Sequence, residues 1–222
     1  MAASELERAR ALLPGAPDAM LIEGLIEDLG RRLELTPPTN LHVAASFQGI
    51  KDIQVADMDW AGMLTPSEDG AFVLTVRQGD RPHRRNFTIS HEITHTFLPG
   101  YTVVQHRCGG SATRSLIGDP HMESLADVGA AELLLPRRFL QPVFADLPFT
   151  MAAVKAVADT HHASLDATLR RLLQLTHRPA VVVDVRQSTH PDGDSQTMIH
   201  RVFSNSEWCP IAPSQLSGKR VG

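Results

Sequence analysis

One segment of the sequence combines a helical repeat of apolar residues with the spacing of a metal-binding pair. Residues 87–97 read FTISHEITHTF and place His91 and His95 four positions apart. On an α-helix, residues four apart lie one turn above each other on the same face. The apolar residues recur at the same interval, roughly opposite the histidines, at Ile89, Ile93 and Phe97. The segment therefore predicts a helix that anchors one face in the core and turns its histidines toward a cleft.

The two histidines have the spacing expected of ligands to one zinc ion. Two imidazoles on one helix face can each approach zinc to ~2.0–2.1 Å. Glu92 is rotated by about 100° from His91, so its carboxylate can approach a metal-bound water from the side. The pattern predicts His91 and His95 as metal ligands and Glu92 as the catalytic base. A structural alternative, two partly buried histidines with one paired to Glu92, stays open.

A catalytic zinc site also needs a third protein ligand, with one position left for water. The downstream candidates are His106, Cys108, His121, Glu123 and Asp127. Small residues that would let a second helix approach the first lie beside the two carboxylates, at Ala126, Ala130 and Ala131. Glu123 could then reach the metal, with Asp127 accepting a hydrogen bond from the outer nitrogen of a ligand histidine. The alternative is an acidic helix face in contact with solvent.

Charge and hydropathy limit the class of protein. The 222 residues carry 21 Lys and Arg against 25 Asp and Glu, a net charge of −4, which argues against nucleic-acid binding through a wholly basic surface. No apolar run approaches the ~20 residues of a membrane helix. The first residues, MAASELERARALL, lack the apolar stretch of a secretory signal, and Cys108 and Cys209 are expected to be free thiols. We therefore expect a cytoplasmic protein with no membrane partner.

The order of the predicted elements indicates an α+β fold. Helices are expected over residues 19–35, 87–97, 121–135 and, as a pair split near residues 161–163, over 150–177. Strands are expected over residues 42–47, 55–63, 71–77, 180–186 and 198–203, the last two as a hairpin. Asn86 and Ser164 are the expected N-caps of two of the helices.

Two motifs together resemble the ImmA/IrrE family of HExxH metallopeptidases. The first, RRNFTISHEITHTF, matches the family's pattern at Arg85, Phe87, Thr88, His91, Glu92 and His95. The second, ESLADVGAAELLLP, matches at Glu123, Ala126, Asp127, Ala130, Leu133, Leu134 and Pro136. The resemblance covers roughly residues 20 to 180. It implies His91, His95 and Glu123 as the metal ligands and Glu92 as the catalytic carboxylate.

Two positions depart from the family's pattern. Gly129 stands where the family usually carries Phe, which predicts a gap in the packing between the helices. Asp127 stands where Asn is commoner, and its negative charge would make the metal site more electron-rich. Neither departure removes a ligand.

The resemblance implies a zincin-like, mostly helical metallopeptidase core with a small antiparallel sheet. We expect this core over residues 1–148, a helix-turn-helix-like unit over residues 149–178 and a strand-containing tail with a hairpin over residues 179–222. Residues 71–77 are a candidate edge strand that would bind an extended substrate through its backbone, although an ordinary core strand fits the same pattern. Tyr101 and His106 are candidates to stabilise the oxyanion.

The resemblance also implies a function. It predicts a zinc-dependent endopeptidase whose protein substrate is a helix-turn-helix transcriptional repressor, cleaved to switch on a stress response or a mobile-element programme. The ligand set would also accept Mn²⁺ or Fe²⁺. The alternative is a regulator that binds a repressor or DNA without cleaving, as in a toxin–antitoxin pair, with a structural or vestigial metal site. The intact Glu92 argues against this alternative, because a structural site needs no general base.

The helix pair at residues 150–177 has the length and turn position of a DNA-binding helix-turn-helix. Its second helix, however, offers only Arg170 and Arg171, with Arg178 just beyond. We therefore favour a packing or substrate-docking role for this pair over direct DNA binding.

Overall fold

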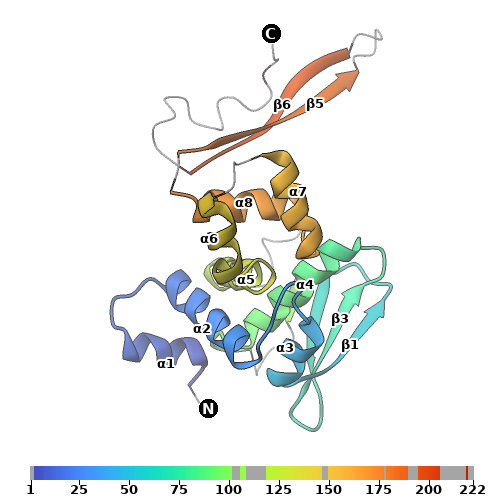
Figure 1. Cartoon of the computed structure of the whole chain (residues 1–222). Coiled ribbons are helices and arrows are strands. Elements are labelled where there is room, and N and C mark those ends of the chain that lie inside the picture. Colours follow the sequence, from blue (N-terminus) through green and yellow to red (C-terminus); the bar gives the residue numbers. More distant parts are fainter. Residues whose placement is uncertain are drawn as a thin grey trace.

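The computed structural model describes residues 3–101, 106–108, 119–146, 150–177, 179–189, 195–205 and 219, with the backbone alone at 106–108, 144–146, 188, 189 and 195. Its elements confirm the α+β class (Figure 1). The helices are α1 (Glu5–Leu12), α2 (Asp18–Arg32), α3 (Leu41–Phe47), α4 (Pro82–His95), α5 (Pro120–Leu134), α6 (Arg137–Asp146), α7 (Met151–Thr160) and α8 (Leu165–Leu175). The strands are β1 (Ile50–Ala56), β2 (Gly62–Pro66), β3 (Phe72–Arg77), β4 (His106–Cys108), β5 (Val181–Thr189) and β6 (Ser195–Ser204).

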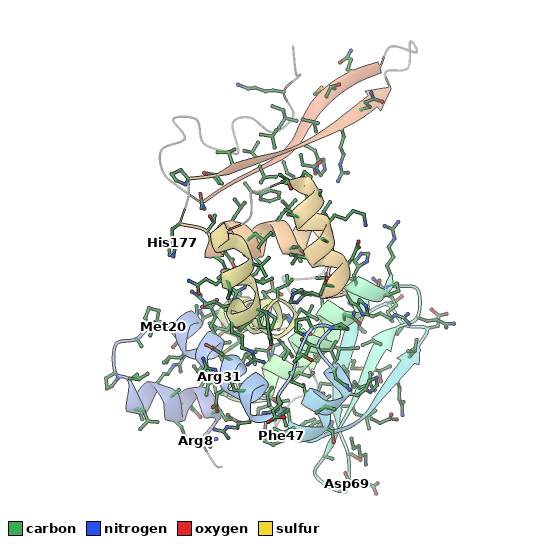
Figure 2. All side chains as sticks on the ribbon, viewed as in Figure 1. Arg8, Met20, Arg31, Phe47, Asp69 and His177 are labelled. Carbon is green, nitrogen blue, oxygen red and sulfur yellow. The ribbon has the colours of Figure 1, made fainter. Side chains whose placement is uncertain are left out.

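The larger sheet has the order β1-β3-β2-β4 and lies beside α4 (Figure 1). β2 pairs antiparallel with β3 and β4, but β1 pairs parallel with β3. The prediction of an antiparallel sheet is therefore wrong for one of the three pairings. The reason is that β2 and β3 form a tight hairpin, whose tip is marked by Asp69 in Figure 2, and β1 adds to the outer side of β3.

Strand β3 is a core strand, the alternative that the sequence left open, and not the candidate edge strand. It lies between β1 and β2, and its side chains at Phe72, Leu74 and Val76 are buried. Among the described strands, β1 and β4 form the edges of this sheet. Alternating burial shows that one face of a strand packs on a core, but it does not tell a central strand from an edge strand.

Several predicted boundaries or types are wrong in the N-terminal half of the chain. The strand predicted over residues 55–63 is divided between the end of β1 and the start of β2. Residues 42–47, predicted as a strand, lie in helix α3, where the Asn40 side chain accepts a hydrogen bond from the Val43 amide at 3.2 Å. Helix α4 begins at Pro82 rather than near residue 87, because proline suits a first helical position. Asn86 is therefore inside the helix and donates to the His162 carbonyl at 3.1 Å. Helix α1, with its capping box at Ser4, was not predicted.

Helices α4 and α5 pack closely through small residues. Ala126 and Ala130 are fully buried in this contact region. At Gly129, an added Cβ would lie 2.3 Å from Thr94 Cγ2 and 3.1 Å from Ile22 Cγ2. The gap predicted at Gly129 is therefore wrong, since side chains of α4 and α2 fill the space that a larger residue would need. This close approach brings the first turn of α5 to the histidines of α4.

The C-terminal helices and hairpin form as predicted. Ser164 caps α8, accepting a hydrogen bond from the Ala167 amide at 3.1 Å. Strands β5 and β6 pair antiparallel, and the guanidinium of Arg170 lies 4.2 Å from the ring centroid of Phe203 in β6. The residues that connect these two strands, 190–194, lie outside the described part of the chain. The division into three units at residues 148 and 178 stays a prediction.

A buried ionic network joins α8 to the helices around the site. Arg171 is only 2% exposed, forms an ion pair with Glu132 of α5 and donates to Glu23 of α2 at 2.7 Å. Burial raises the pKa of the Glu132 carboxyl to about 7, against the opposing attraction of Arg171. Arg171, one of the arginines considered for DNA contact, is therefore buried between helices and paired with carboxylates. No helix in the described part of the chain is long and apolar enough to cross a membrane.

Candidate metal centre

His91 and His95 lie on the inner face of α4, one turn apart. Both side chains are buried, and their Nε2 atoms are 3.0 Å apart. Their ring centroids are 4.8 Å apart with an interplanar angle of 71°. The two imidazoles therefore direct one nitrogen each toward a common point, as the helical spacing predicts.

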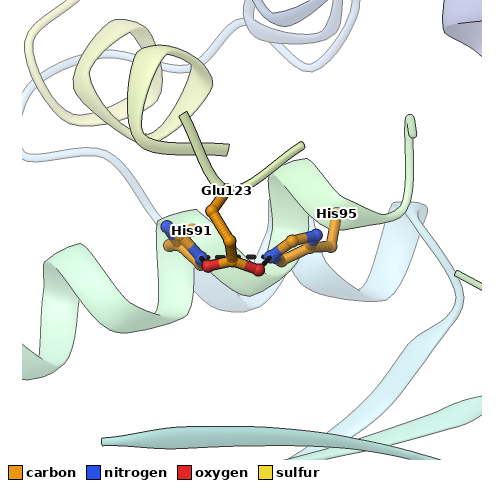
Figure 3. A group of neighbouring side chains, drawn as sticks. All are labelled: His91, His95 and Glu123. Atoms are coloured by element: carbon orange, nitrogen blue, oxygen red, sulfur yellow. Dashed lines mark hydrogen bonds and ion pairs between the residues drawn. The ribbon is translucent and has the colours of Figure 1, made fainter. Parts of the chain in front are cut away.

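Glu123 reaches the same point from the first turn of α5 (Figure 3). Its Oε2 lies 3.2 Å from His91 Nε2 and its Oε1 lies 3.3 Å from His95 Nε2. Ligand atoms at ~2.0–2.1 Å from a tetrahedral zinc ion are about 3.3 Å from one another. The three side chains therefore have the donor types and separations that a zinc ion requires, and among the described residues they form the group that fits a metal.

The other candidates for the third ligand lie elsewhere or are not described. His121 is directed away from the histidine pair and contacts Asp18 of α2, with Nε2 2.8 Å from Oδ2. The side chains of His106 and Cys108 lie outside the described part of the structure. Tyr101 packs against Phe72, with ring centroids 5.5 Å apart, and burial raises the pKa of its hydroxyl. The oxyanion roles of Tyr101 and His106 stay predictions.

Asp127 orients the first histidine. Its Oδ1 lies 3.0 Å from His91 Nδ1, on the ring edge opposite the shared point. An ionised Asp127 accepts the proton of Nδ1–H, which leaves the Nε2 lone pair of His91 available to a metal. This is the contact that the spacing of Glu123 and Asp127 predicts.

The charge of Glu123 suits a ligand. Burial alone would raise the pKa of its carboxyl, but hydrogen bonds to His91 and His95 outweigh burial and hold the pKa below its ordinary value. Glu123 is therefore ionised at neutral pH. A carboxylate together with two imidazoles is a ligand set found in catalytic zinc sites.

Glu92 is the most unusual side chain near the centre. It is fully buried, and neither carboxylate oxygen has a hydrogen-bond partner among the described residues. Leaving a buried acceptor unpaired costs about 1–3 kcal/mol, and more for a charged group. Such a cost in a native site indicates a role with a ligand, so the residues present fit a hydrolytic metal centre better than a structural one.

Gly62 of β2 sets the space that Glu92 occupies, and sequence reasoning missed it. A Cβ at this position would lie 2.4 Å from Thr88 Cγ2 and 3.0 Å from Glu92 Oε1. The sequence did contain an indication, because a glycine inside a strand often marks a position where another chain segment approaches closely. Only the structure identifies that segment as α4.

We expect Gly62→Ala to lower the free energy of unfolding by about 1–3 kcal/mol, because the new methyl group overpacks the β2–α4 contact. Denaturant-induced unfolding measures the change. Adding Thr88→Ser removes the methyl group that lies 2.4 Å from the new Cβ, so the double variant should recover part of the loss. A double variant no more stable than Gly62→Ala would show that the strain lies elsewhere.

The comparison with known proteins agrees with this geometry. Residues 48–173 match the family described as the IrrE N-terminal-like domain, a peptidase family, and the chain belongs to it. The family confirms the resemblance to ImmA/IrrE proteins, and a metallopeptidase family implies a bound metal. The helices α4 and α5 that carry His91, His95 and Glu123 both lie within the matched region.

Two individual proteins are similar over part or most of the chain. The radiation response metalloprotease IrrE of Deinococcus deserti is 28% identical over 122 residues, covering 51% of this chain and 42% of the relative. The solved structure of a transcriptional regulator of Mycobacterium tuberculosis matches with a TM-score of 0.52 at 15% identity, covering 94% of this chain and 62% of the regulator. The chain thus spans less than two thirds of either protein, and the second likeness concerns the fold alone.

Proposed function

We propose that this chain is a zinc-dependent endopeptidase that cleaves a helix-turn-helix transcriptional repressor and so relieves repression of a stress-response or mobile-element programme. The observation that carries the hydrolytic part is the buried, unpaired carboxylate of Glu92 beside the His91–His95–Glu123 group. The repressor substrate is suggested by the family resemblance, and the radiation response in the relative's name favours a stress programme. Such a substrate would place the activity in the cytoplasm.

Each residue of the centre has a role in this proposal. His91, His95 and Glu123 hold the metal, and Asp127 fixes the orientation of His91. The Lewis acidity that polarises a scissile carbonyl and makes water a better nucleophile would come from a zinc ion held by these side chains, and Mn²⁺ or Fe²⁺ would fit the same donors. Glu92 accepts a proton from the attacking water at a carboxylate oxygen and delivers it to the leaving amine nitrogen. The buried site keeps this proton exchange away from bulk water.

The test is to incubate the purified, zinc-loaded chain with candidate helix-turn-helix repressors and to analyse the products by mass spectrometry. We expect one repressor to be cut at a defined bond, with cleavage abolished by a chelator and restored by added zinc. Metal analysis of Glu123→Ala accompanies the assay and should show loss of stoichiometric metal. Cleavage that persists in chelator would contradict the hydrolytic mechanism. Full metal content in Glu123→Ala would show that Glu123 is not the third ligand.

The alternative is a regulator that binds a repressor or DNA without cleaving it. Two contacts weaken its DNA-binding form: Arg171 is buried against Glu132, and Arg170 pairs with Asp166 at 3.1 Å. Arg178 lies outside the described residues. Direct DNA binding through α8 is therefore not favoured, in agreement with the charge balance of the chain.

A further inference from the structure

Three arginines at the start of α4 have no carboxylate partner among the described side chains. They are Arg81 at the N-cap position, Arg84 and Arg85, all at least partly exposed. The other described arginines on the helices form ion pairs, such as Arg31 with Glu27, or donate to backbone carbonyls, as Arg8 and Arg138 do. Among the described residues, these three arginines therefore form a positive surface, which we name the arginine cluster, on a chain whose net charge is −4.

The arginine cluster lies in line with the metal centre on the same helix. Arg84 precedes His91 by seven residues, which places the two on one face about 10.5 Å apart along the helix axis. The aromatic ring of Phe87 lies between them: its centroid is 5.9 Å from Arg84 Cζ and 6.3 Å from the His91 ring centroid. Arg85 has the same seven-residue relation to Glu92. A chain crossing the metal centre along α4 would therefore meet the arginine cluster.

The position of the arginine cluster is unfavourable without an anion. Positive side chains at a helix N-terminus oppose the helix dipole, and side chains at spacings of three and four repel one another when they carry the same charge. The first turn of α4 has no acidic residue to offset this repulsion. An acidic partner from outside would relieve both effects.

We propose that Arg81, Arg84 and Arg85 form a docking surface for an acidic segment of the peptide substrate. This inference rests on the proposed endopeptidase function and deepens it. An extended chain rises ~3.3 Å per residue, so the axial separation of about 10.5 Å corresponds to about three residues. Asp or Glu about three residues from the cleaved bond would therefore reach Arg84.

A peptide fits this surface better than a nucleic acid. A duplex presents a long row of phosphates, and binding one requires basic residues spread over an extended surface. The arginine cluster instead occupies one end of one helix, and the arginines of α8 are engaged by Asp166, Glu132 and Glu23. The compact cluster matches one or two carboxylates that precede or follow a scissile bond.

The experiment measures binding without cleavage. The full-length chain carrying Glu92→Gln is titrated into a fluorescein-labelled Glu-rich peptide and into the same peptide with Gln at every Glu position, and fluorescence anisotropy reports binding. We expect tighter binding of the Glu-rich peptide, weakening as salt is raised. Adding Arg84→Gln and Arg85→Gln should reduce its affinity about tenfold, since two exposed ion pairs contribute on this order. The matched control is Arg31→Gln on α2, labelled in Figure 2, which should leave the affinity unchanged.

Equal affinity for the two peptides, or equal affinity of the Arg84→Gln/Arg85→Gln and Arg31→Gln chains, would overturn the proposal. Tighter binding of a DNA duplex that also depends on Arg84 and Arg85 would overturn it as well, in favour of phosphate recognition. Thermal unfolding of each variant verifies that it is folded. Because the assay needs no catalysis, a chain that binds the Glu-rich peptide as expected but cleaves no repressor would contradict the proposed function alone.

Discussion

Glu92→Gln is expected to reduce peptide-bond cleavage by about 10²–10⁴-fold, the usual contribution of a general base. Glutamine has nearly the same shape as glutamate but cannot accept the proton of the attacking water. The proposed ligands His91, His95 and Glu123 are unchanged, so metal content should stay stoichiometric. Initial rates of repressor cleavage and metal analysis of the same preparation measure the two quantities.

The same variant should not lose stability. Glu92 is fully buried with both carboxylate oxygens unpaired among the described residues, so an amide of nearly the same shape breaks no hydrogen bond of the described structure. The matched control is Glu68→Gln, at an exposed position in the β2–β3 turn, which should cleave at the parental rate. If the Glu92→Gln variant relieves repression as well as the unmodified chain does, a regulator that binds without cleaving explains the function better than an endopeptidase.

Arg171→Met is expected to lower the free energy of unfolding by about 3–5 kcal/mol, because it leaves the buried Glu132 without its charged partner. Glu132 is 2% exposed, and its remaining hydrogen bond comes from the Arg137 amide at 3.1 Å. Denaturant-induced unfolding at neutral pH measures the change. Arg170→Met on the same helix removes a half-exposed ion pair and should cost less than about 1 kcal/mol.

The Glu132 network also predicts how stability depends on pH. Burial raises the pKa of Glu132 from 4.5 to about 7, so between these values the folded chain binds more protons than the unfolded chain. Stability contributed by this group is therefore present below pH 4.5 and is lost as the pH rises toward 7. Arg171→Met should extend this loss to higher pH, because the pKa of Glu132 rises further without the attraction of Arg171, and Glu132→Leu/Arg171→Met should remove the loss and recover much of the stability. An Arg171→Met chain as stable as the parent at pH 7 would contradict both expectations.

The sequence predicts the residues of the candidate metal centre better than it predicts the topology of the four-stranded sheet. His91 and His95 lie on the opposite helix face from Ile89 and Ile93, and this arrangement depends only on local geometry. The sequence alone could therefore predict α4 and the face that carries its histidines. The approach of Glu123 depends on a contact between distant segments, but small residues and the family's second motif both indicated it. The metal ligands, the catalytic role of Glu92 and the bound ion stay predictions, while the proximity of the side chains is now a structural observation.

The errors concern features that only long-range contacts decide. The segment LHVAASF has too few residues for a clear period, and its helix depends on the Asn40 cap. The central place of β3 follows from pairing with β1, which no local pattern encodes. At Gly129 the family's Phe suggested a gap, whereas the neighbours Thr94 and Ile22 have taken that volume.

The contact at Gly129 links the packing of two helices to the geometry of the candidate metal centre. The distance between α4 and α5 is limited there by the Thr94 side chain, and the same distance determines how far Glu123 stands from His91 and His95. Any replacement at residue 129 that spreads the helices would also increase the distances from Glu123 to His91 and His95. Substitutions at residues 94 and 129 should therefore be tolerated in compensating pairs during evolution, and metal selectivity should change together with them.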